Sequence, residues 1–127
     1  MKFELPPAEI RRLEGIRSEL EGDINEYLTD GYEAVALHSS SIILDVNQAC
    51  ADLFGYSRED MIFLNAWKLF PPESVQEIMQ HLLKKSTEPY RVKALHKSGT
   101  NFTVELKGYD FKIAGEPVRS VLLKKIS

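Results

Sequence analysis

The sequence predicts an α+β fold in which an amphipathic helix precedes a five-stranded antiparallel sheet and three further helices. Three patterns indicate this. Apolar residues recur at helical spacing over residues 10–28, short extended runs and capped helices follow, and after residue 89 apolar and polar residues alternate as in half-buried strands. The chain has 127 residues, of which 43% are hydrophobic and 28% charged, as expected for one globular domain.

The first predicted element is a helix that begins at Pro6-Pro7, because a missing N–H costs nothing in the first helical turn. Its apolar side chains recur at steps of three and four and form one stripe: Ile10, Leu13, Ile16, Leu20, Ile24, Tyr27 and Leu28. Thr29-Asp30-Gly31 is expected to end it. Residues 1–31 are thus predicted to be a flanking segment and residues 32–127 the main domain. Two interpretations stay open, since the stripe could lie on its own domain or partly on a partner subunit.

A hairpin and a capped helix are predicted next. Ala34–His38 and Ile42–Val46 read as two strands joined across Ser39-Ser40-Ser41. Asn47 is suited to cap the helix Gln48–Phe54, because its side-chain oxygen can accept a free helical N–H.

Two more helices and three strands complete the prediction. Gly55 suits the end of the first short helix, Ser57 opens a second, and Pro71-Pro72-Glu73 opens a longer third. The buried stripe expected on the third is Val75, Ile78, Met79 and Leu82. Strands are then predicted around Tyr90–Leu95, around Phe102–Lys107 and over Val118–Ile126, separated by the turns 97–100 and 114–117.

The composition and motifs exclude several classes of protein. The net charge of −3 and a basic C-terminal part without stacking aromatics argue against nucleic-acid binding. No apolar run is long enough to insert in a membrane, and the single cysteine fits a reducing compartment, so we expect a cytoplasmic protein. No His, Cys, Asp or Glu set has the spacing of a metal site.

An enzyme is not expected either. The chain lacks a glycine-rich phosphate loop, a G-x-S-x-G elbow and an H-E-x-x-H pair. The strand acids Asp45, Glu105 and Asp110 are expected on the outward face of the sheet, away from any interior site.

The stretch Ile43–Met61, ILDVNQACADLFGYSREDM, resembles the first half of PAS domains. Residues 92–106, VKALHKSGTNFTVEL, and 115–127, GEPVRSVLLKKIS, are similar to the last three strands of that family. The order and spacing of the three pieces carry the resemblance, which runs from about residue 32 to the end. It implies a sheet that curls round the short helices on its concave face, with the N-terminal helix flanking the outer face.

The resemblance also implies a function. PAS domains serve sensing, dimerisation and signal relay rather than catalysis, so we expect the sensor part of a larger bacterial-type signalling protein such as a diguanylate cyclase, a histidine kinase or a regulator. The expected partners are a second copy of the chain and a signalling effector. Two alternatives stay open: a free-standing carrier of a small apolar ligand, and a haem-binding gas sensor.

The resemblance argues against flavin. The light-oxygen-voltage PAS domains carry a reactive cysteine where this sequence has Ala66, and two flavin-binding asparagines where it has Ala94 and Val104. Cys50 is expected to be a buried packing residue instead.

Haem is not expected because it needs an axial ligand. His81 is the one histidine on the long helix, where haem-binding relatives place theirs, but the inward stripe of that helix turns His81 to the rim. His38, at the end of a strand, and His96, before a turn, are expected to be solvated.

Strand alternation predicts which side chains face the interior. Because Asp45 is expected to face outward, Leu44 and Val46 are expected to face inward. The full candidate ligand-binding set is Leu37, Leu44, Val46, Ile78, Leu82, Tyr90, Val92, Ala94, Phe102, Val104, Leu106, Val121 and Leu123. We expect these side chains to fill the interior at core density. The alternative is a small apolar or amphipathic ligand, held by shape and by a polar contact from Tyr90 or Trp67.

The outward face of the sheet is predicted to carry an apolar strip that needs a cover. The N-terminal helix is the expected cover, and in PAS domains such a helix commonly builds a dimer. The candidate dimer-interface residues are Ile10, Leu13, Leu20, Ile24, Ile43 and Leu122.

Overall fold

The computed structural model describes residues 5–20, 22–29, 31–85 and 87–126. Its helices and strands follow in the order α1 (Pro7–Ser18), the 3-10 helix η1 (Ile24–Tyr27), β1 (Ala34–Ser39), β2 (Ile42–Val46), α2 (Gln48–Phe54), α3 (Arg58–Met61), the 3-10 helix η2 (Ala66–Leu69), α4 (Pro72–Leu83), β3 (Tyr90–Leu95), β4 (Asn101–Ile113) and β5 (Glu116–Lys125). The predicted α+β fold is confirmed.

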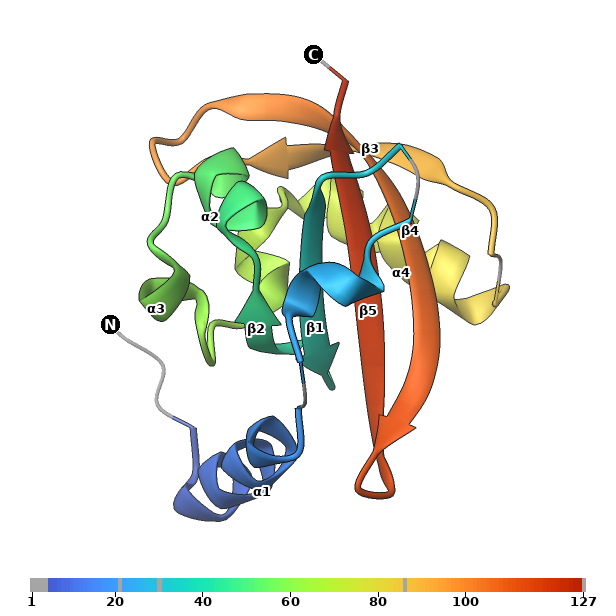
Figure 1. The fold of residues 1–127 in the computed structure, drawn as a ribbon. Helices are drawn as coiled ribbons and strands as arrows, with labels where there is room; N and C mark the ends of the chain where they lie inside the picture. Colours follow the sequence, from blue (N-terminus) through green and yellow to red (C-terminus); the bar gives the residue numbers. More distant parts are fainter. Residues whose placement is uncertain (1–4, 21, 30, 86, 127) are drawn as a thin grey trace.

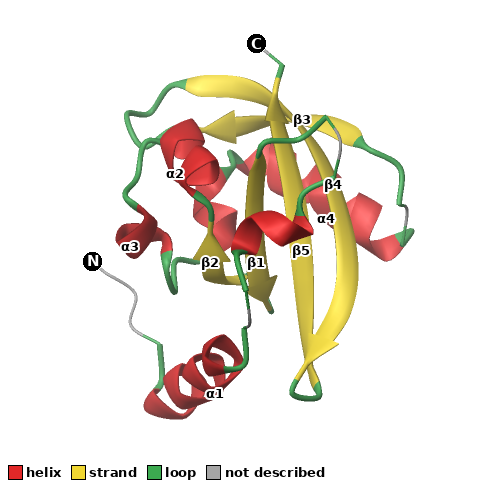
Figure 2. Cartoon of the chain, in the orientation of Figure 1, coloured by secondary structure: helices red, strands yellow, loops and turns green. Residues whose placement is uncertain are grey.

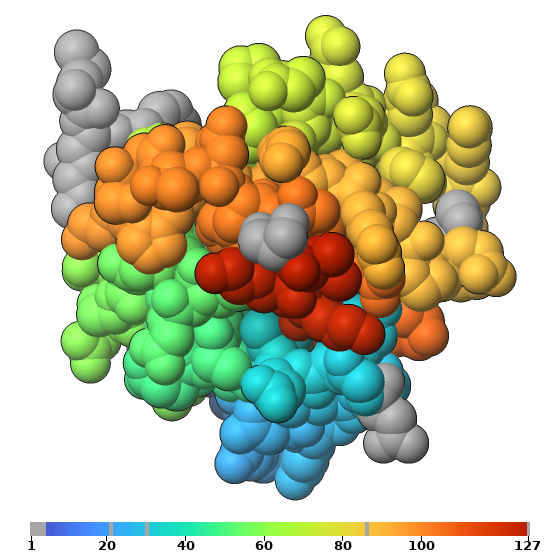
Figure 3. Space-filling view, turned by 90° about the horizontal axis from the view of Figure 1, so that it is seen from above, coloured from blue at the N-terminus to red at the C-terminus, as the bar shows by residue number. Residues whose placement is uncertain are grey.

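The five strands form one antiparallel sheet in the order β2-β1-β5-β4-β3. Seen from above, the red C-terminal part of the chain lies between orange residues and cyan residues, in keeping with the place of β5 between β4 and β1 (Figure 3). β1 pairs with β2 on one side and with β5 on the other, so it is an interior strand. Figures 1 and 2 show α4 on one face of the sheet and η1 on the opposite face. Both faces of the sheet are therefore covered, and a side chain of β1 is buried whichever way it points.

The predicted caps of the short helices are confirmed. The Asn47 side chain accepts a hydrogen bond from the Cys50 N–H at 3.0 Å, and the Ser57 hydroxyl accepts one from the Asp60 N–H at 3.1 Å. Gly55 ends α2 with φ of 81°, the left-handed conformation that favours glycine. These local signals define the helix ends without any help from tertiary packing.

The N-terminal helix is shorter than predicted. The apolar stripe predicts one helix through Leu28, but α1 ends at Ser18. Gly22 adopts φ of 76°, which no helix accommodates, and the Asp23 side chain caps η1 by accepting from the Asn25 N–H. The chain therefore turns between α1 and η1, and the two parts of the stripe reach the sheet separately.

The outer face of the sheet is covered by α1 and η1, as the apolar strip predicted. The outer cluster, as we call this packed group, consists of Leu13, Ile16, Ile24, Val35, Leu37, Ile42, Leu44, Val118 and Leu122. The chain's own domain thus takes up the buried side of α1. Four of the proposed dimer-interface residues are buried within the monomer, namely Leu13, Ile24, Ile43 and Leu122.

In the first hairpin, the predicted inward orientation is wrong for Leu37 and Leu44. Both belong to the outer cluster, whereas Ala34 and Ala36 of β1 face the inner core. The prediction placed the larger side chains of β1 inward, as for a sheet with one solvated face. Because α1 covers the outer face here, the larger side chains of β1 pack outward.

A β-bulge explains the error in β2. Leu37 pairs with Asp45 and His38 pairs with Ile43, so Leu44 is an extra residue in its strand. The bulge breaks the simple alternation from Asp45. Ile43 and Val46 consequently face the inner core while Leu44 faces outward, which corrects the outward placement of Ile43 and confirms the inward placement of Val46.

The α4 stripe also differs at one position. Ile78 is buried as predicted, but Met79 is 48% exposed and Ser74 is buried in its place. Ser74, Ile78 and Leu82 follow one another at a spacing of four, so they form the face that α4 turns to the sheet.

The turn between β1 and β2 has residues that are not the most favourable for its backbone conformation. Ser40 and Ser41 adopt φ of 50° and 72°, the two positive values that a type I′ hairpin requires and that Asn-Gly adopts more readily. The double substitution Ser40→Asn with Ser41→Gly is expected to raise the free energy of unfolding by about 0.5–1 kcal/mol. Urea unfolding measures the gain; an unchanged or lower midpoint would show that the turn is not strained.

Candidate functional site

A cavity of about 80 Å³ lies between the inner face of the sheet and the helices α2, η2 and α4. Six of the predicted ligand-facing side chains line it: Ile78, Leu82, Tyr90, Leu106, Val121 and Leu123. Because one water molecule needs roughly 10–15 Å³ of such space, the cavity has room for several waters or one short organic chain.

The expectation of a completely filled interior is wrong, and the reason lies in small side chains. Ala36, Cys50 and Ala66 all line the cavity. In β1, Val35 and Leu37 point to the outer cluster, and the residue between them that faces inward is Ala36. A valine or leucine at this position would fill part of the cavity. The cavity therefore exists because the large side chains of β1 pack on the outer face, under α1, and the small one faces inward.

Five other predicted residues belong to the inner core but do not line the cavity: Val46, Val92, Ala94, Phe102 and Val104. They pack beside it, where the ring of Phe102 meets that of Phe54 with centroids 5.6 Å apart. Leu37 and Leu44 lie on the opposite face of the sheet. Alternation therefore predicted the inward apolar side chains of β3, β4 and β5 correctly and those of the first hairpin poorly.

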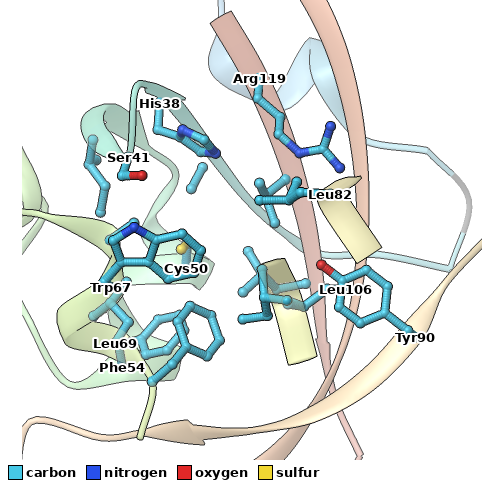
Figure 4. Close-up of a pocket in the computed structure, with 17 residues that line it drawn as sticks. His38, Ser41, Cys50, Phe54, Trp67, Leu69, Leu82, Tyr90, Leu106 and Arg119 are labelled. Atoms are coloured by element: carbon cyan, nitrogen blue, oxygen red, sulfur yellow. The ribbon is translucent and has the colours of Figure 1, made fainter. Parts of the chain in front are cut away.

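One end of the cavity is polar (Figure 4). His38, Ser41 and Arg119 lie at this end, while Phe54 and Leu69 lie at the other. The hydroxyl of Tyr90 points toward the cavity rather than away from it. The site thus has the form of an apolar pocket with polar groups gathered at one end.

The polar end is built by one row of residues across three strands. His38 of β1 pairs with Arg119 of β5, and Arg119 pairs with Asp110 of β4. The expectation that Asp110 lies on the outward face is wrong, because it shares the face of Leu106, two alternations away along β4. The guanidinium of Arg119 donates to Asp110 at 3.0 Å.

His38 is mostly buried, contrary to the solvated position predicted for it. Its Nδ1 is buried and has no hydrogen-bond partner among the described residues. Burial lowers the pKa of His38 to about 4, with a further lowering from the charge of Arg119 and an opposing effect from Asp110. The imidazole is therefore neutral at physiological pH.

This buried histidine makes stability depend on pH. The folded-state pKa of about 4 lies below the ordinary 6.5, so between these values the unfolded chain binds a proton that the native chain does not. Stability is expected to fall by about 3 kcal/mol as the pH drops from 6.5 to 4, with the carboxylates adding their own effects. His38→Gln should lose this component, and the difference between urea unfolding curves of the two proteins isolates it. Parallel pH profiles would contradict the burial of a neutral His38.

Two further pocket groups are unreactive by environment. Burial raises the pKa of the Cys50 thiol to about 12, which confirms it as a packing residue. Tyr90 stacks on His81 with ring centroids 3.8 Å apart, and burial raises the pKa of its phenol. His81 is half-buried beside this pocket-lining ring, so the predicted rim position is confirmed.

The polar pair His38 and Arg119 was missed as a site by the sequence reasoning. A signal was present, since Arg119 shares the strand parity of Val121 and Leu123, which were predicted to face inward. Gly108 gave a second signal, because a glycine in the middle of a strand marks a close approach by another group.

A family model described as a PAS domain matches residues 32–127, about three quarters of the sequence. The chain belongs to this family. The match begins after α1 and η1, so these two elements precede the part that the family model describes. No curated protein matches the sequence.

Solved PAS domains share the fold. A PAS domain of a two-component sensor histidine kinase is 18% identical, with 94% of this chain and 99% of that chain covered at a TM-score of 0.67. A PAS domain from Desulfitobacterium hafniense is 16% identical, with 80% and 99% covered at 0.65. A PAS domain of a LuxR-family transcriptional regulator from Burkholderia thailandensis, in complex with ethanol, is 14% identical, with 82% and 97% covered at 0.62.

PAS domains are sensory signalling modules and are generally not catalytic, and this chain is one of them. Within the described ranges, no helix is long and apolar enough to cross a membrane. Across the same part of the chain, no three His, Cys, Asp or Glu side chains gather as a metal site would require. The positions that the resemblance matches to the reactive cysteine and the two asparagines of the flavin-binding domains carry apolar side chains here, namely Ala66, Ala94 and Val104.

Proposed function

We propose that this PAS domain senses a small molecule in its inner cavity and relays occupancy through β1 to α1 on the opposite face. The observation that carries the proposal is the division of β1 between the two sites. Ala36 and His38 line the cavity, whereas Val35 and Leu37 belong to the outer cluster with α1. Because neighbouring residues of one strand move together, a displacement of β1 by a ligand reaches the packing of α1.

The surroundings of the cavity support binding rather than simple packing. The Nδ1 of His38 has no partner among the residues that the structure describes, and unpaired buried groups are costly. The ethanol complex of the Burkholderia thailandensis PAS domain shows that a domain of this fold holds a small amphipathic molecule. Neither haem nor flavin is part of the proposal.

We further propose that two copies of the chain associate through α1 and act on a covalently or non-covalently linked effector in the cytoplasm, as in a histidine kinase, a diguanylate cyclase or a regulator. Of the six predicted interface residues, Ile10 and Leu20 are only half-buried in the monomer and are available for such a contact. The other four lie inside the domain, so the proposed interface uses Ile10 on α1 and Leu20 just after it.

Sedimentation velocity tests the homodimer. The full chain and the Arg11→Glu variant are expected to sediment as dimers, whereas Ile10→Glu is expected to sediment as a monomer. Both substitutions place a carboxylate on α1, but Arg11 is fully on the exposed side. A monomeric parent chain would contradict the association, and equal dimerisation of the two variants would remove α1 from the interface.

The relay is tested by reciprocity, since two coupled sites must affect each other by the same factor. Trp67 is the single tryptophan and lines the cavity, so its fluorescence reports binding of the probe 1-butanol. Ile16→Val loosens α1 on the outer cluster and is expected to change the affinity for 1-butanol about fivefold or more. Met79→Val, on an exposed position of α4, is the matched control. Equal affinities in all three proteins would contradict the relay.

A further inference from the structure

We propose that the cavity selects small molecules that combine a short apolar body with one carboxylate, the carboxylate lying against Arg119 and His38. This inference rests on the proposed function, because it names the chemical class of the molecule that the cavity would sense. It follows from four observations at the polar end of the cavity.

The first observation is a mostly buried guanidinium with unused donors. The side chain of Arg119 is 16% exposed, and the described residues offer it one hydrogen bond, from Nη1 to Asp110. Nε and Nη2 have no acceptor within that part of the chain. Together they form one edge of the guanidinium, the arrangement that binds both oxygens of a carboxylate.

The second observation is that Gly108 of β4 leaves the space in which this guanidinium lies. A Cβ on Gly108 would clash with Nη2 of Arg119 and would lie 2.6 Å from Cζ and 2.7 Å from Nε. Only a glycine lets the planar group lie against β4 at this point. Glycine in a strand interior lowers stability, but the missing Cβ at Gly108 is what allows the guanidinium to lie at this position.

The third observation is the Nδ1 of His38, which has no hydrogen-bond partner in the described part of the chain and lies in the same cross-strand row as Arg119. A neutral imidazole can carry its proton on Nδ1 and donate it to a carboxylate oxygen. Binding would then give this buried polar atom a hydrogen-bond partner.

The fourth observation is the balance of charge around the cavity. The titratable and charged side chains at the polar end are His38, Tyr90, Asp110 and Arg119, and the first two are neutral at physiological pH. The carboxylate of Asp110 is 78% exposed, so it neutralises Arg119 from the solvent side rather than from the cavity. A cationic ligand would face Arg119 as a like charge, and a neutral one could accept hydrogen bonds from its edge without adding an opposite charge.

The apolar end limits the rest of the ligand. Phe54, Leu69 and Leu123 line it, and the volume of about 80 Å³ admits a short chain only. Butyrate is therefore a suitable probe, with butyramide as its neutral isostere and 1-butanol as a neutral alcohol.

The test is a titration of the full chain at pH 7 with each probe, read by Trp67 fluorescence. Butyrate is expected to bind about tenfold or more tightly than butyramide, because the carboxylate brings an opposite charge and a second acceptor oxygen to the Arg119 edge, whereas the amide has one acceptor and no charge. Equal or tighter binding of butyramide or 1-butanol would overturn the carboxylate class while leaving the relay intact. Binding of no probe at all would overturn both proposals.

Three variants locate the effect. Arg119→Met is expected to abolish the preference for butyrate, and Gly108→Ala is expected to reduce it because the methyl group displaces the guanidinium without removing its charge. Arg91→Met removes a charge of the same sign from β3, where the side chain is 62% exposed, and is expected to leave the preference unchanged. An equal loss in Arg91→Met would mean that general surface charge, not this site, attracts the anion. Gly108→Ala keeps the test decisive if Arg119→Met does not fold.

Discussion

Replacing Asn47 with alanine is expected to lower the free energy of unfolding by about 3–5 kcal/mol, a large part of the stability of a domain this size. The side chain is 4% exposed and makes four hydrogen bonds. Its oxygen accepts from the N–H groups of Val35 at 3.1 Å and Cys50 at 3.0 Å. Its amide nitrogen donates to the Asn25 side chain and to the Glu33 carbonyl, both at 2.8 Å.

The large effect follows from what alanine would leave behind. The N–H groups of Val35 and Cys50 would be buried without an acceptor, each at a cost of about 1–3 kcal/mol. The same side chain joins η1, the start of β1 and the start of α2, so its loss loosens three elements at once.

A matched control separates the network from a single contact. Asn25→Ala removes only one of the four hydrogen bonds, at an exposed residue, and is expected to cost about 1 kcal/mol. Urea unfolding followed by Trp67 fluorescence measures both variants. If Asn47→Ala lowered the free energy of unfolding no more than Asn25→Ala does, Asn47 would be an ordinary helix cap rather than a residue that holds three elements together.

Leu13→Ala is expected to lower the free energy of unfolding by about 3 kcal/mol, within the range of 2–5 kcal/mol found for buried leucines. Leu13 is 0% exposed and belongs to the outer cluster, so alanine would leave a cavity between α1 and the sheet. Glu14→Ala, at the next and exposed position of α1, is the control and should change stability by less than about 0.5 kcal/mol.

The Leu13→Ala experiment decides whether α1 is part of the folded domain. Urea unfolding should show one transition that shifts to lower denaturant, since α1 and the sheet share one packed cluster. A loss below about 1 kcal/mol would contradict the packing of α1 on the sheet.

The sequence predicted the local features of the fold because each depends on a few neighbouring residues. Asn47, Gly55 and Ser57 mark helix ends through hydrogen bonds or backbone angles that they set themselves. The strand alternation of β3 and β4 likewise placed Val104 and Leu106 on the inner face. These signals do not require knowledge of what covers the sheet.

The orientation of the first hairpin could not be predicted in the same way. Its side chains have apolar surroundings on both faces, so Val35 and Leu37 could face either side without exposing apolar surface. The bulge at Leu44 leaves no mark in the composition. The length of α1 was overestimated for a related reason, because a turn at Gly22 can lie within an unbroken apolar stripe.

The candidate site depended on both of these features. Ala36 faces inward only because β1 has the unpredicted orientation, and the cavity exists because this side chain is small. His38 lies on the same side of β1 as Ala36, so it is buried for the same reason. Arg119 could have been placed from the parity of β5, but its contact with Gly108 depends on the pairing of two strands and is visible only in the structure.

Hydrogen–deuterium exchange in α1 tests most directly whether the pocket communicates with the helix behind the sheet. The amides of residues 10–18 would be followed in the full chain with and without butyrate or 1-butanol at a concentration that saturates the Trp67 signal. We predict that occupancy changes the exchange of these amides together with those of β1, and that Ile16→Val alters the size of the change. Exchange in α1 that stays constant while β1 and the pocket respond would contradict the account.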